Sequence, residues 1–475
     1  MATATTTPAA VPDREELPGD ARGRIEALCD PGSFRALRSG VLSDRLGERA
    51  RAGDGVVAGA GEVDGRPVFC YAQDPSFMGG SLGEEHANSI VRVMELAGRA
   101  GAPVVGFVES GGARLQDGHA GLAGYGRIFR TSVELSSRVP QISVVTGVSA
   151  GGGSYSPALT DFVLMTDAAR MFLTGPRVVR EALGEEVTME DLGGPRVHEG
   201  NGVCQLVAGS EEEAAERIRE LLAVLPQAIG DPPPPAEPVT AIGAVPRVPD
   251  EARRVYDVRE VVAAVVDAGW MLEISARWAR NMVTGFARIE GRPVGIVANQ
   301  PRRIGGVIDA AASEKAARFV RLCDRFRLPL VVLVDTPGFM PGTRQESAGV
   351  IRHGASLLRA FAAASVPRLT VVLRKAYGGA VITMNSKDLG ADVVFAWPGA
   401  EIGIMAANQA IGIVHRRRLR EASDPDEIGA ELAAAYAEEH LTAGAAAASG
   451  FIDEVIEPAQ TRDRLGWALA SLESR

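Results

Sequence analysis

Two stretches of the sequence decide the fold, GAPVVGFVESGG at Gly101–Gly112 and RLPLVVLVDTPG at Arg327–Gly338. Each has an apolar run that does not alternate with polar residues and that ends at an acidic residue and a glycine-bearing loop. Such runs are typical of strands that are buried on both faces of a parallel sheet. The two stretches also match each other, because Pro103 and Pro329 lie 226 positions apart, as do the glycines that end the stretches.

The match continues on both sides of these strands. Upstream, Gly79–Gly80 precede Gly305–Gly306 by the same 226 positions. Downstream the spacing is 227 positions, and it relates Pro140 to Pro367, Gly151–Gly152 to Gly378–Gly379 and Asp161 to Asp388. Two nearly constant spacings are not expected by chance, so the sequence predicts an internal duplication.

Both copies predict the same order of elements. A Gly-Gly turn is followed by an amphipathic helix, a buried strand, a second helix, a second strand and a glycine-rich turn that opens another helix. The first helices are expected at 89–99 and 312–326, the first strands at 104–108 and 330–334, and the second strands at 141–146 and 369–373. Buried strands separated by helices indicate an α/β fold with a parallel sheet in each half.

A proline-rich segment separates the halves. Residues 230–238 read GDPPPPAEP, which suits neither a helix interior nor a central strand and predicts a stiff, polyproline-type linker. A long surface loop within one domain is the alternative, and the duplication on either side favours a domain boundary. The predicted organisation is a disordered N-terminal tail at 1–22, an N-terminal domain at 23–229, a linker at 230–250 and a C-terminal domain at 251–475.

The composition excludes several classes of protein. The chain has 475 residues, 46% of them hydrophobic and 23% charged, and its net charge is -10. This balance is that of an ordinary globular protein and argues against a general nucleic-acid binder, which carries a basic face. The four cysteines show no C-x-x-C spacing, which excludes a zinc ribbon. No apolar run reaches the roughly 18 residues of a membrane span, and the N-terminus lacks the apolar core of a signal peptide, so the cytoplasm is the expected location.

The glycine-rich turns are the candidate sites of chemistry. Residues 146–156, TGVSAGGGSYS, and residues 374–382, RKAYGGAVI, each join a strand to a helix. Free backbone N–H groups at a helix N-terminus carry partial positive charge, and glycine lets a substrate approach them closely. Such donors hold an enolate oxygen, where one donor contributes on the order of 3 kcal/mol. Two equivalent turns therefore suggest two oxyanion sites, with close helix–strand packing as the alternative.

The first turn also matches a hydrolase pattern. Gly147–Gly151 fits G-x-S-x-G, the nucleophile elbow, with Ser149 as the nucleophile. The duplicate places Ala376 opposite Ser149, so the feature that the halves share is Gly-Gly, and backbone chemistry is favoured. The sequence has no phosphate-binding G-x-x-x-x-G-K-[ST] loop, and its six histidines show no metal-ligand spacing, so neither nucleotide hydrolysis nor a metal site is predicted.

These motifs resemble those of the biotin-dependent acyl-CoA carboxyltransferases, in particular the β-subunits of propionyl-CoA and general acyl-CoA carboxylases. In the N-terminal half the matching segments are SGGARLQ at 110–116, AGG at 150–152, YSPALTD at 155–161 and GEEVTMEDLGG at 184–194. In the C-terminal half they are ANQP at 298–301, ASEKAARF at 312–319, DTPGFMPG at 335–342, RKAYGGA at 374–380 and AWP at 396–398. They occur in the family's order and cover residues 25–462.

The resemblance implies two tandem crotonase-like domains, each a ββα spiral, and a homo-hexamer built as a dimer of trimers. It implies an active site between the N-terminal half of one subunit and the C-terminal half of another. Acyl-CoA would lie against the N-terminal half, and carboxybiotin would enter from the C-terminal half. The implied reaction passes through two enolates, which two backbone oxyanion holes would stabilise.

The resemblance also assigns residues to three roles by motif match. The oxyanion donors are Gly151, Gly152, Gly379 and Ala380. The acyl-CoA contacts are Gly111, Gly112, Ala113, Arg114, Ala150, Tyr155, Val381 and Ile382. The biotin-side contacts are Gly338, Phe339, Tyr377, Gly378, Met405 and Ala406. Arg114, Arg127 and Arg130 lie near the first glycine loop and are candidates for the CoA phosphates, with solvated helix charge as the alternative.

Biotin is expected on a separate carrier protein that a biotin carboxylase charges, because none of the three lysines lies in a Met-Lys-Met-like biotinylation context. Coenzyme A enters as part of the substrate, and no metal is expected in this subunit. Two rival functions stay open on the sequence alone. One is a decarboxylase of malonyl-type CoA esters with the same fold, and the other is a non-catalytic subunit that assembles with an active relative.

Three places depart from the family's pattern. Val381–Ile382 replaces a frequent Tyr-Asp, which predicts a changed acyl pocket, with neutral repacking as the alternative. MAANQA at 405–410 replaces Met-Gly-Ala-x-Gly-Ala, and the added side chains would narrow the biotin side. Ser89 stands where the family has a helix lysine.

Overall fold

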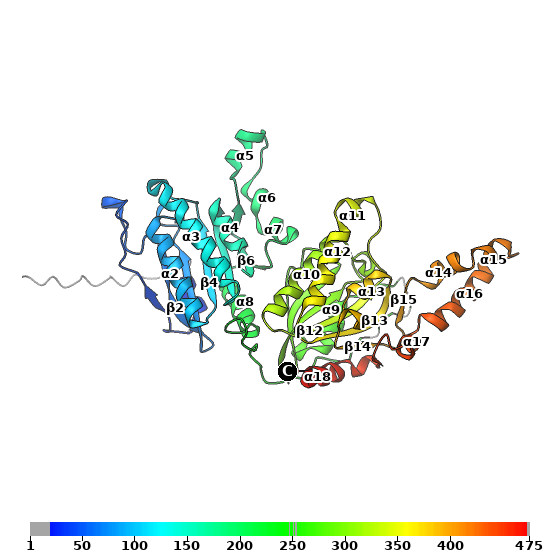
Figure 1. Cartoon of the computed structure of the whole chain (residues 1–475). Helices are drawn as coiled ribbons and strands as arrows, with labels where there is room; N and C mark the ends of the chain where they lie inside the picture. The colour runs from blue at the N-terminus through cyan, green and yellow to red at the C-terminus, as the bar shows by residue number, and fades with distance from the viewer. Residues whose placement is uncertain (1–19, 247, 250, 252–253, 473–475) are drawn as a thin grey trace, which may run out of the picture.

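The computed structural model describes residues 20–246, 248–249, 251 and 254–472. These residues form two eight-stranded sheets, one in each half of the chain. The strands run in the order β1-β2-β3-β4-β5-β6-β8 in the first sheet and β16-β14-β13-β12-β11-β10-β9 in the second, while β7 pairs with β5 and β15 with β13. Figure 1 shows the two halves side by side, each with its own sheet and covering helices.

Among the residues that the structure describes, the first half contains eight α-helices and eight strands. The strands are β1 (Arg35–Leu37), β2 (Val56–Val63), β3 (Arg66–Gln73), β4 (Val104–Ser110), β5 (Gln141–Ala150), β6 (Phe162–Thr166), β7 (Arg170–Phe172) and β8 (Leu206–Ala208). The α-helices among the described residues are α1 (Ala21–Leu28), α2 (Glu84–Ala100), α3 (His119–Leu135), α4 (Gly152–Ala158), α5 (Pro176–Leu183), α6 (Met189–Gly193), α7 (Pro195–Asn201) and α8 (Glu211–Val224).

The second half repeats this order and adds helices near its end. Its strands are β9 (Met271–Glu273), β10 (Met282–Ile289), β11 (Arg292–Asn299), β12 (Leu330–Thr336), β13 (Arg368–Tyr377), β14 (Val393–Ala396), β15 (Glu401–Gly403) and β16 (Glu454–Val455). Its α-helices are α9 (Val258–Val265), α10 (Ala310–Arg325), α11 (Thr343–Ser347), α12 (Val350–Ala363), α13 (Gly379–Thr383), α14 (Ala407–Val414), α15 (Arg416–Glu421), α16 (Pro425–His440), α17 (Ala443–Ala448) and α18 (Thr461–Leu472).

The predicted duplication is confirmed in the details of the two sheets. In each, two antiparallel strand pairs lead into parallel strands, and the pairing shifts register just before the loop that follows β4 or β12. The shifts fall at Ser110 and at Thr336, 226 positions apart. The isolated bridges Leu82–Ala113 and Ile308–Phe339 keep the same spacing. The predicted first strands are also confirmed, since every residue of β12 is buried.

The two sheets share a hydrophobic core. The Phe162 ring at the start of β6 lies 5.9 Å from the ring of Phe286 on β10 and 6.2 Å from that of Phe326 after α10. An ion pair between Asp161 and Arg325 closes the edge of this contact. Apolar burial between the halves therefore holds them together within one chain.

The proline-rich segment lies along the second half. The Ala236 N–H donates to the Gly291 carbonyl at 2.9 Å, and the Arg288 side chain donates to the Pro234 carbonyl at 2.9 Å. Neither helix nor strand interrupts the described residues between α8 and α9.

The described residues begin within the predicted N-terminal tail at 1–22. The Asp20 side chain accepts from the Gly23 N–H and caps α1, which begins at Ala21, and the rest of the predicted tail lies outside the described residues. None of the helices that the structure describes is both long and apolar enough to cross a membrane.

Candidate active site

The first glycine-rich turn joins β5 to α4. Gly151 has a φ of 58°, a conformation that L side chains rarely adopt, and its N–H donates to the carbonyl of Phe172 on β7 at 3.1 Å. The helix begins at Gly152, so the N–H groups of Gly152 and Gly153 precede the first intrahelical bonds and point out of the helix end. These two N–H groups form a candidate oxyanion site.

The second turn has the same construction. Gly378 has a φ of 63°, and its N–H donates to the carbonyl of Gly403 on β15 at 2.9 Å. The helix α13 begins one residue later, which leaves Gly379 and Ala380 as the outward-pointing donors. A methyl group added at Gly379 would meet no atom within 4 Å, so the space in front of this turn is open.

The comparison of the turns bears on one predicted donor. Gly151 corresponds to Gly378, and the N–H of each donates to the neighbouring short strand. This arrangement favours Gly152 over Gly151 as a donor, and the role of Gly151 as a donor stays a prediction. The equivalent pairs are Gly152 with Gly153 and Gly379 with Ala380.

A second loop lies against each turn. In the first half, Gly111, Gly112 and Ala113 follow β4, and the Gly112 N–H donates to Ser110 Oγ at 3.3 Å. A methyl group on Gly112 would lie 3.6 Å from the Ala150 carbonyl oxygen, so the loop and the turn are neighbours.

The loop of the second half repeats this arrangement. The Gly338 N–H donates to Thr336 Oγ1 at 3.3 Å, and a methyl group on Gly338 would lie 4.0 Å from the Tyr377 carbonyl oxygen. The Gly338 loop and the backbone of Tyr377 are therefore neighbours, while the ring of Phe339 lies 3.3 Å from a methyl group added at Gly354.

Sequence reasoning missed Tyr125, which supports the first turn. Its ring is 5% exposed, and a methyl group added at Gly152 would lie 2.8 Å from Cδ2 of that ring. Its hydroxyl is 3.2 Å from Ser110 Oγ, the atom that accepts from Gly112. Burial raises the pKa of the Tyr125 phenol. Tyr125 thus joins the loop after β4 to the turn after β5, and no sequence motif signals this contact.

The nucleophile reading of Ser149 does not fit the structure. Ser149 lies within β5, which runs to Ala150 rather than ending at Thr146 as predicted. The side chain is fully buried and precedes the sharp turn, whereas a nucleophile elbow exposes its serine at the turn itself.

The three candidate arginines lie in different surroundings. Arg114 is 1% exposed, and its guanidinium donates to Asp54 Oδ1 at 2.5 Å and to the Ser81 carbonyl at 3.1 Å. Nη1 and Nη2 are thus bound within the fold, and the buried Nε has no partner among the described residues, so its contact with a CoA phosphate stays a prediction that this burial does not favour. Arg130 is exposed and lies 3.4 Å from Glu134. Arg127 is half-buried, and its Nε and Nη2 have no hydrogen-bond partner among the described residues.

A charged cluster lies beneath the second turn. Asp335 at the end of β12 is fully buried and accepts from Arg374 Nε at 3.0 Å. Burial raises the pKa of the Asp335 carboxyl, and the nearby Arg374 opposes this effect. The Tyr377 hydroxyl donates to Glu401, which links β13 to β15. In the first half Glu109, which corresponds to Asp335, pairs with Arg24 of α1 instead, at 2.9 Å.

The remaining predicted residues differ in exposure. Val381 is 9% exposed and packs into the core, whereas Ile382 is 48% exposed on α13. Tyr155 is 52% exposed on α4, and its ring meets Phe129 edge to face. Met405 and Ala406 are half-buried directly after β15. Ile382 and Tyr155 are thus available to a ligand, and Val381 contributes through packing.

Ser89, which stands where the family has a lysine, accepts a hydrogen bond from an arginine. Arg38 Nε donates to Ser89 Oγ at 3.0 Å and Arg38 also pairs with Glu85. At the equivalent position of the second half, Lys315 is buried and donates to the carbonyls of Ser275, Trp278 and Met282.

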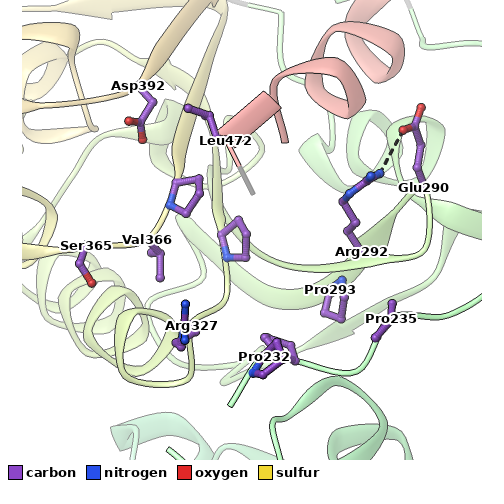
Figure 2. Close-up of a pocket in the computed structure, with 13 residues that line it drawn as sticks. Pro232, Pro235, Glu290, Arg292, Pro293, Arg327, Ser365, Val366, Asp392 and Leu472 are labelled. Carbon is purple, nitrogen blue, oxygen red and sulfur yellow. Dashed lines mark hydrogen bonds and ion pairs between the residues drawn. The ribbon is translucent and has the colours of Figure 1, made fainter. Parts of the chain in front are cut away.

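The cavity in Figure 2 lies away from both turns. It has a volume of about 690 Å³ and is lined by prolines of the linker together with Pro293 and Arg327. Its walls are the amino ends of β11–β14, whereas the glycine turns follow the carboxyl ends of β5 and β13. It is therefore not the site that the turns form.

The two turns lie in different halves of the chain. Figure 1 shows α4 on the first half and α13 on the second, with α10 and α12 between them. Two crotonase-like units, each presenting paired backbone donors at a strand–helix turn, define a class of enzymes that stabilise oxyanions without a side-chain nucleophile.

The comparisons with known proteins identify the family within this class. The carboxyl transferase domain model matches residues 20–475. This chain belongs to the carboxyl transferase family. It is 47% identical over 471 residues to the propionyl-CoA carboxylase carboxyltransferase subunit of Haloferax mediterranei, covering 96% of this chain and 90% of that protein.

Two further relatives carry information on cofactor and assembly. The biotin-dependent acetyl-/propionyl-coenzyme A carboxylase beta5 subunit of Mycobacterium tuberculosis is 46% identical over 477 residues, covering 96% of this chain and 87% of that protein. The crystal structure of the transcarboxylase 12S hexamer with methylmalonyl-coenzyme A bound superposes with a TM-score of 0.93 at 44% identity, over 96% of this chain and 89% of that one.

Proposed function

We propose that this protein is the carboxyltransferase subunit of an acyl-CoA carboxylase, which moves a carboxyl group to the α-carbon of a short or medium acyl-CoA. The observation that carries the proposal is the pair of equivalent turns, Gly152–Gly153 and Gly379–Ala380, each with two N–H groups free of the sheet. Two reacting partners that each develop an oxyanion require two such sites.

Biotin, delivered on a separate carrier protein, supplies the activated carboxyl group. The open space in front of Gly379 fits the approach of such a carrier-borne group to the backbone. Met405 and Ala406 border this side, since they follow the strand that holds Gly378. No step of the proposal needs a metal ion or a side-chain nucleophile.

The first turn would stabilise the acyl thioester as its enolate forms. The N–H groups of Gly152 and Gly153 would donate to the thioester oxygen, and the loop at 111–113 and Tyr155 would border the acyl-CoA. Gly152 is kept in place by Tyr125, so the donors are fixed before the substrate binds. Assignment of this turn to the thioester rests on the family resemblance.

Arg127 is the candidate for the CoA phosphates. Its Nε and Nη2 atoms are buried without a hydrogen-bond partner among the described residues, and it lies on α3, two positions after Tyr125. A planar guanidinium suits bidentate contact with a phosphate. Arg114, in contrast, is buried and positions the loop at 111–113 from inside the fold.

We further propose that the protein acts as a homo-hexamer with its active sites between subunits, as the sequence resemblance implies. The solved relative named as a hexamer supports this assembly. Because the turns of one chain lie in separate halves, a second copy would bring a Gly379 turn to a Gly152 turn. A cytoplasmic location is proposed with this function.

The test is turnover of acetyl-, propionyl-, butyryl-, malonyl- and methylmalonyl-CoA, followed by mass spectrometry. Each is incubated with the protein alone, and with a biotin carboxylase, a biotinylated carrier, ATP and bicarbonate. Carboxylation only in the complete mixture is the expected result. Loss of CO2 from malonyl-type esters by the protein alone would instead identify a decarboxylase. No reaction in either mixture would leave an assembly subunit, which a mixed hexamer with an active relative would reveal.

A further inference from the structure

The loop that follows β4 ends at a buried arginine. Arg114 is 1% exposed and comes directly after residues 111–113, the loop that the proposed function places beside the acyl-CoA. Its backbone N–H donates to the Leu82 carbonyl at 2.9 Å, and its Nη2 donates to the Ser81 carbonyl at 3.1 Å. This one residue therefore ties the end of the loop to the segment that precedes α2.

Asp54 is the anion that holds this arginine. Its Oδ1 accepts from Arg114 Nη1 at 2.5 Å, and its backbone carbonyl accepts from Nη2 at 3.0 Å. The other carboxylate oxygen accepts from the N–H of His86 on α2 at 2.9 Å, and Asp54 is fully buried. Hydrogen bonds between charged groups are about twice as strong as neutral ones, and removal of one partner would leave the other charge buried without compensation.

The backbone around Asp54 is bent in a way that presents the carboxylate to Arg114. Gly53, Asp54 and Gly55 have φ values of 81°, 51° and 83°, in the left-handed region that residues other than glycine rarely adopt. A residue such as Asp54 keeps this conformation only where its surroundings determine it. The hydrogen bonds to Arg114 and to the start of α2 supply that constraint.

A second carboxylate completes the cluster. Asp117 lies in the short 3-10 turn after the loop, and its Oδ1 is 3.7 Å from Arg114 Nη1. Its Oδ2 accepts from the N–H of Glu84, the first residue of α2, at 2.7 Å. The cluster thus joins the turn at 53–55, the start of α2 and the residues that directly follow the loop.

The equivalent positions carry different residues in the second half. The residues 226 positions after Asp54, Arg114 and Asp117 are Arg280, Met340 and Thr343, of which Arg280 and Thr343 are exposed. The carbonyl that corresponds to that of Ser81 belongs to Val307, and it accepts from the neutral amide of Asn281 at 2.8 Å. The buried ionic cluster therefore belongs to the half that the proposed function assigns to the acyl-CoA.

The first loop depends on such an anchor more than the second loop does. It consists of Gly111, Gly112 and Ala113, and glycine has the largest conformational freedom of any residue. The second loop contains Pro337, whose ring fixes φ, and Phe339, whose ring would lie 3.3 Å from a methyl group added at Gly354. Without the cluster the first loop would sample more conformations, and substrate binding would have to order it.

We infer that Asp54, Arg114 and Asp117 form an ionic clamp that holds the loop at 111–113 in the conformation that binds acyl-CoA. Asp54 is a positioning residue, since it acts through Arg114 and lies inside the fold. The inference rests on the proposed function for its kinetic consequence, whereas the order of the loop is measured without substrate.

Two variants of the full-length chain remove the ionic clamp in different ways. Asp54→Ala leaves the Arg114 guanidinium buried without its anion. The triple variant Asp54→Asn/Arg114→Met/Asp117→Asn removes every charge of the clamp and places at 114 the residue that the second half has, so its urea midpoint should stay near that of the parent. Both variants should raise the KM for propionyl-CoA about tenfold and leave the KM for the carboxylated carrier unchanged.

Hydrogen exchange measures the loop directly, in the absence of substrate. With mass spectrometric detection, peptides that cover residues 110–118 should exchange roughly tenfold faster in both variants than in the parent. Peptides that cover residues 336–343 should exchange at the parental rate and serve as the internal control.

The matched control is Arg45→Ala. Arg45 pairs with Glu84 at 2.8 Å at the same end of α2, but this ion pair lies on the surface. Surface pairs contribute little, so this variant should keep the parental KM and the parental exchange at 110–118.

Several outcomes would overturn the inference. A folded triple variant with the parental KM for propionyl-CoA would do so, as would parental exchange at 110–118. Equal increases in the KM for propionyl-CoA and for the carrier would also do so, because a general structural defect affects both substrates. If Asp54→Ala does not fold, the triple variant decides. If exchange changes as expected but neither the parent nor any variant carboxylates an acyl-CoA, the ionic clamp stands and the proposed function fails.

Discussion

Replacement of Gly152 by alanine should damage the first turn far more than the same change at Gly379 damages the second. The two glycines occupy equivalent positions, each as the first residue of its helix. At Gly152 the new Cβ would lie 2.8, 2.9 and 3.0 Å from three atoms of the Tyr125 ring, while at Gly379 it would meet nothing within 4 Å. The ring cannot move aside easily, because it is 5% exposed and packed into the core of the first half.

The magnitudes follow from these contacts. Overpacking of a buried site typically costs about 1–3 kcal/mol, so Gly152→Ala should lower the free energy of unfolding by that amount. Relief of the overlap displaces the turn, and loss of one well-aligned oxyanion donor costs about 3 kcal/mol, or roughly a hundredfold in turnover. Gly379→Ala should keep or slightly raise stability, because alanine restricts the unfolded chain more than glycine does. It should lower turnover only by occupying the open approach to the donors.

The assay is urea denaturation and acyl-CoA carboxylation for both variants, together with Tyr125→Leu and the double variant Gly152→Ala/Tyr125→Leu. Removal of the ring should relieve the overlap, so the double variant should be at least about 1 kcal/mol more stable than the sum of the single effects predicts. Strict additivity, or parental stability of Gly152→Ala, would refute the account of Tyr125 as the support of this turn.

Three further predictions concern specificity, binding and pH. Ile382→Asp should change the ratio of turnover between propionyl-CoA and butyryl-CoA, because Ile382 is exposed beside the second turn; an unchanged ratio would remove it from the acyl pocket. Arg127→Ala should raise the KM for acyl-CoA about tenfold and leave that of the acyl-pantetheine thioester unchanged, since only the former has the distal phosphates; equal effects on both would exclude a phosphate contact. Burial lowers the pKa of His86 from 6.5 to about 3, so the unfolded chain takes up a proton near pH 6.5 that the folded protein rejects. The stability contributed by the neutral His86 is complete above pH 6.5, and the free energy of unfolding falls by about 2 kcal/mol by pH 5. The urea midpoint of His86→Gln should therefore decline less over this range than that of the parent.

Local sequence was enough to predict the sheets. The runs after Pro103 and Pro329 contain no polar residue before the acidic residue near their end. A strand that is buried on both faces of a sheet requires such a run, so its burial follows from composition alone. The second strands were predicted too short, because residues 147–150 look like a loop by glycine content. Pairing of Ser149 with Ser110 and Met171 extends β5 through them.

Two predicted residues of the candidate site have partners in the fold that the sequence does not indicate. Gly151 looks like a donor because it opens a glycine-rich run, but the carbonyl that takes its N–H comes from β7, 21 positions later. Arg114 looks like a phosphate ligand because it follows a glycine loop, but Asp54, 60 positions earlier, holds it inside the fold. Both partners are distant in the chain, so no local pattern points to them.

The sequence by itself determined the duplication, the α/β class, the two glycine turns and the family, since each depends on residue types at short or constant spacing. Only the tertiary structure decided which N–H groups of the turns are held by the sheet, that Arg114 is buried, and that Tyr125 supports the first turn. It also placed the two turns in separate halves of the molecule. These properties depend on atoms brought together by packing, where a hydrogen bond or a ring contact is decided within a few tenths of an ångström and leaves no pattern along the chain.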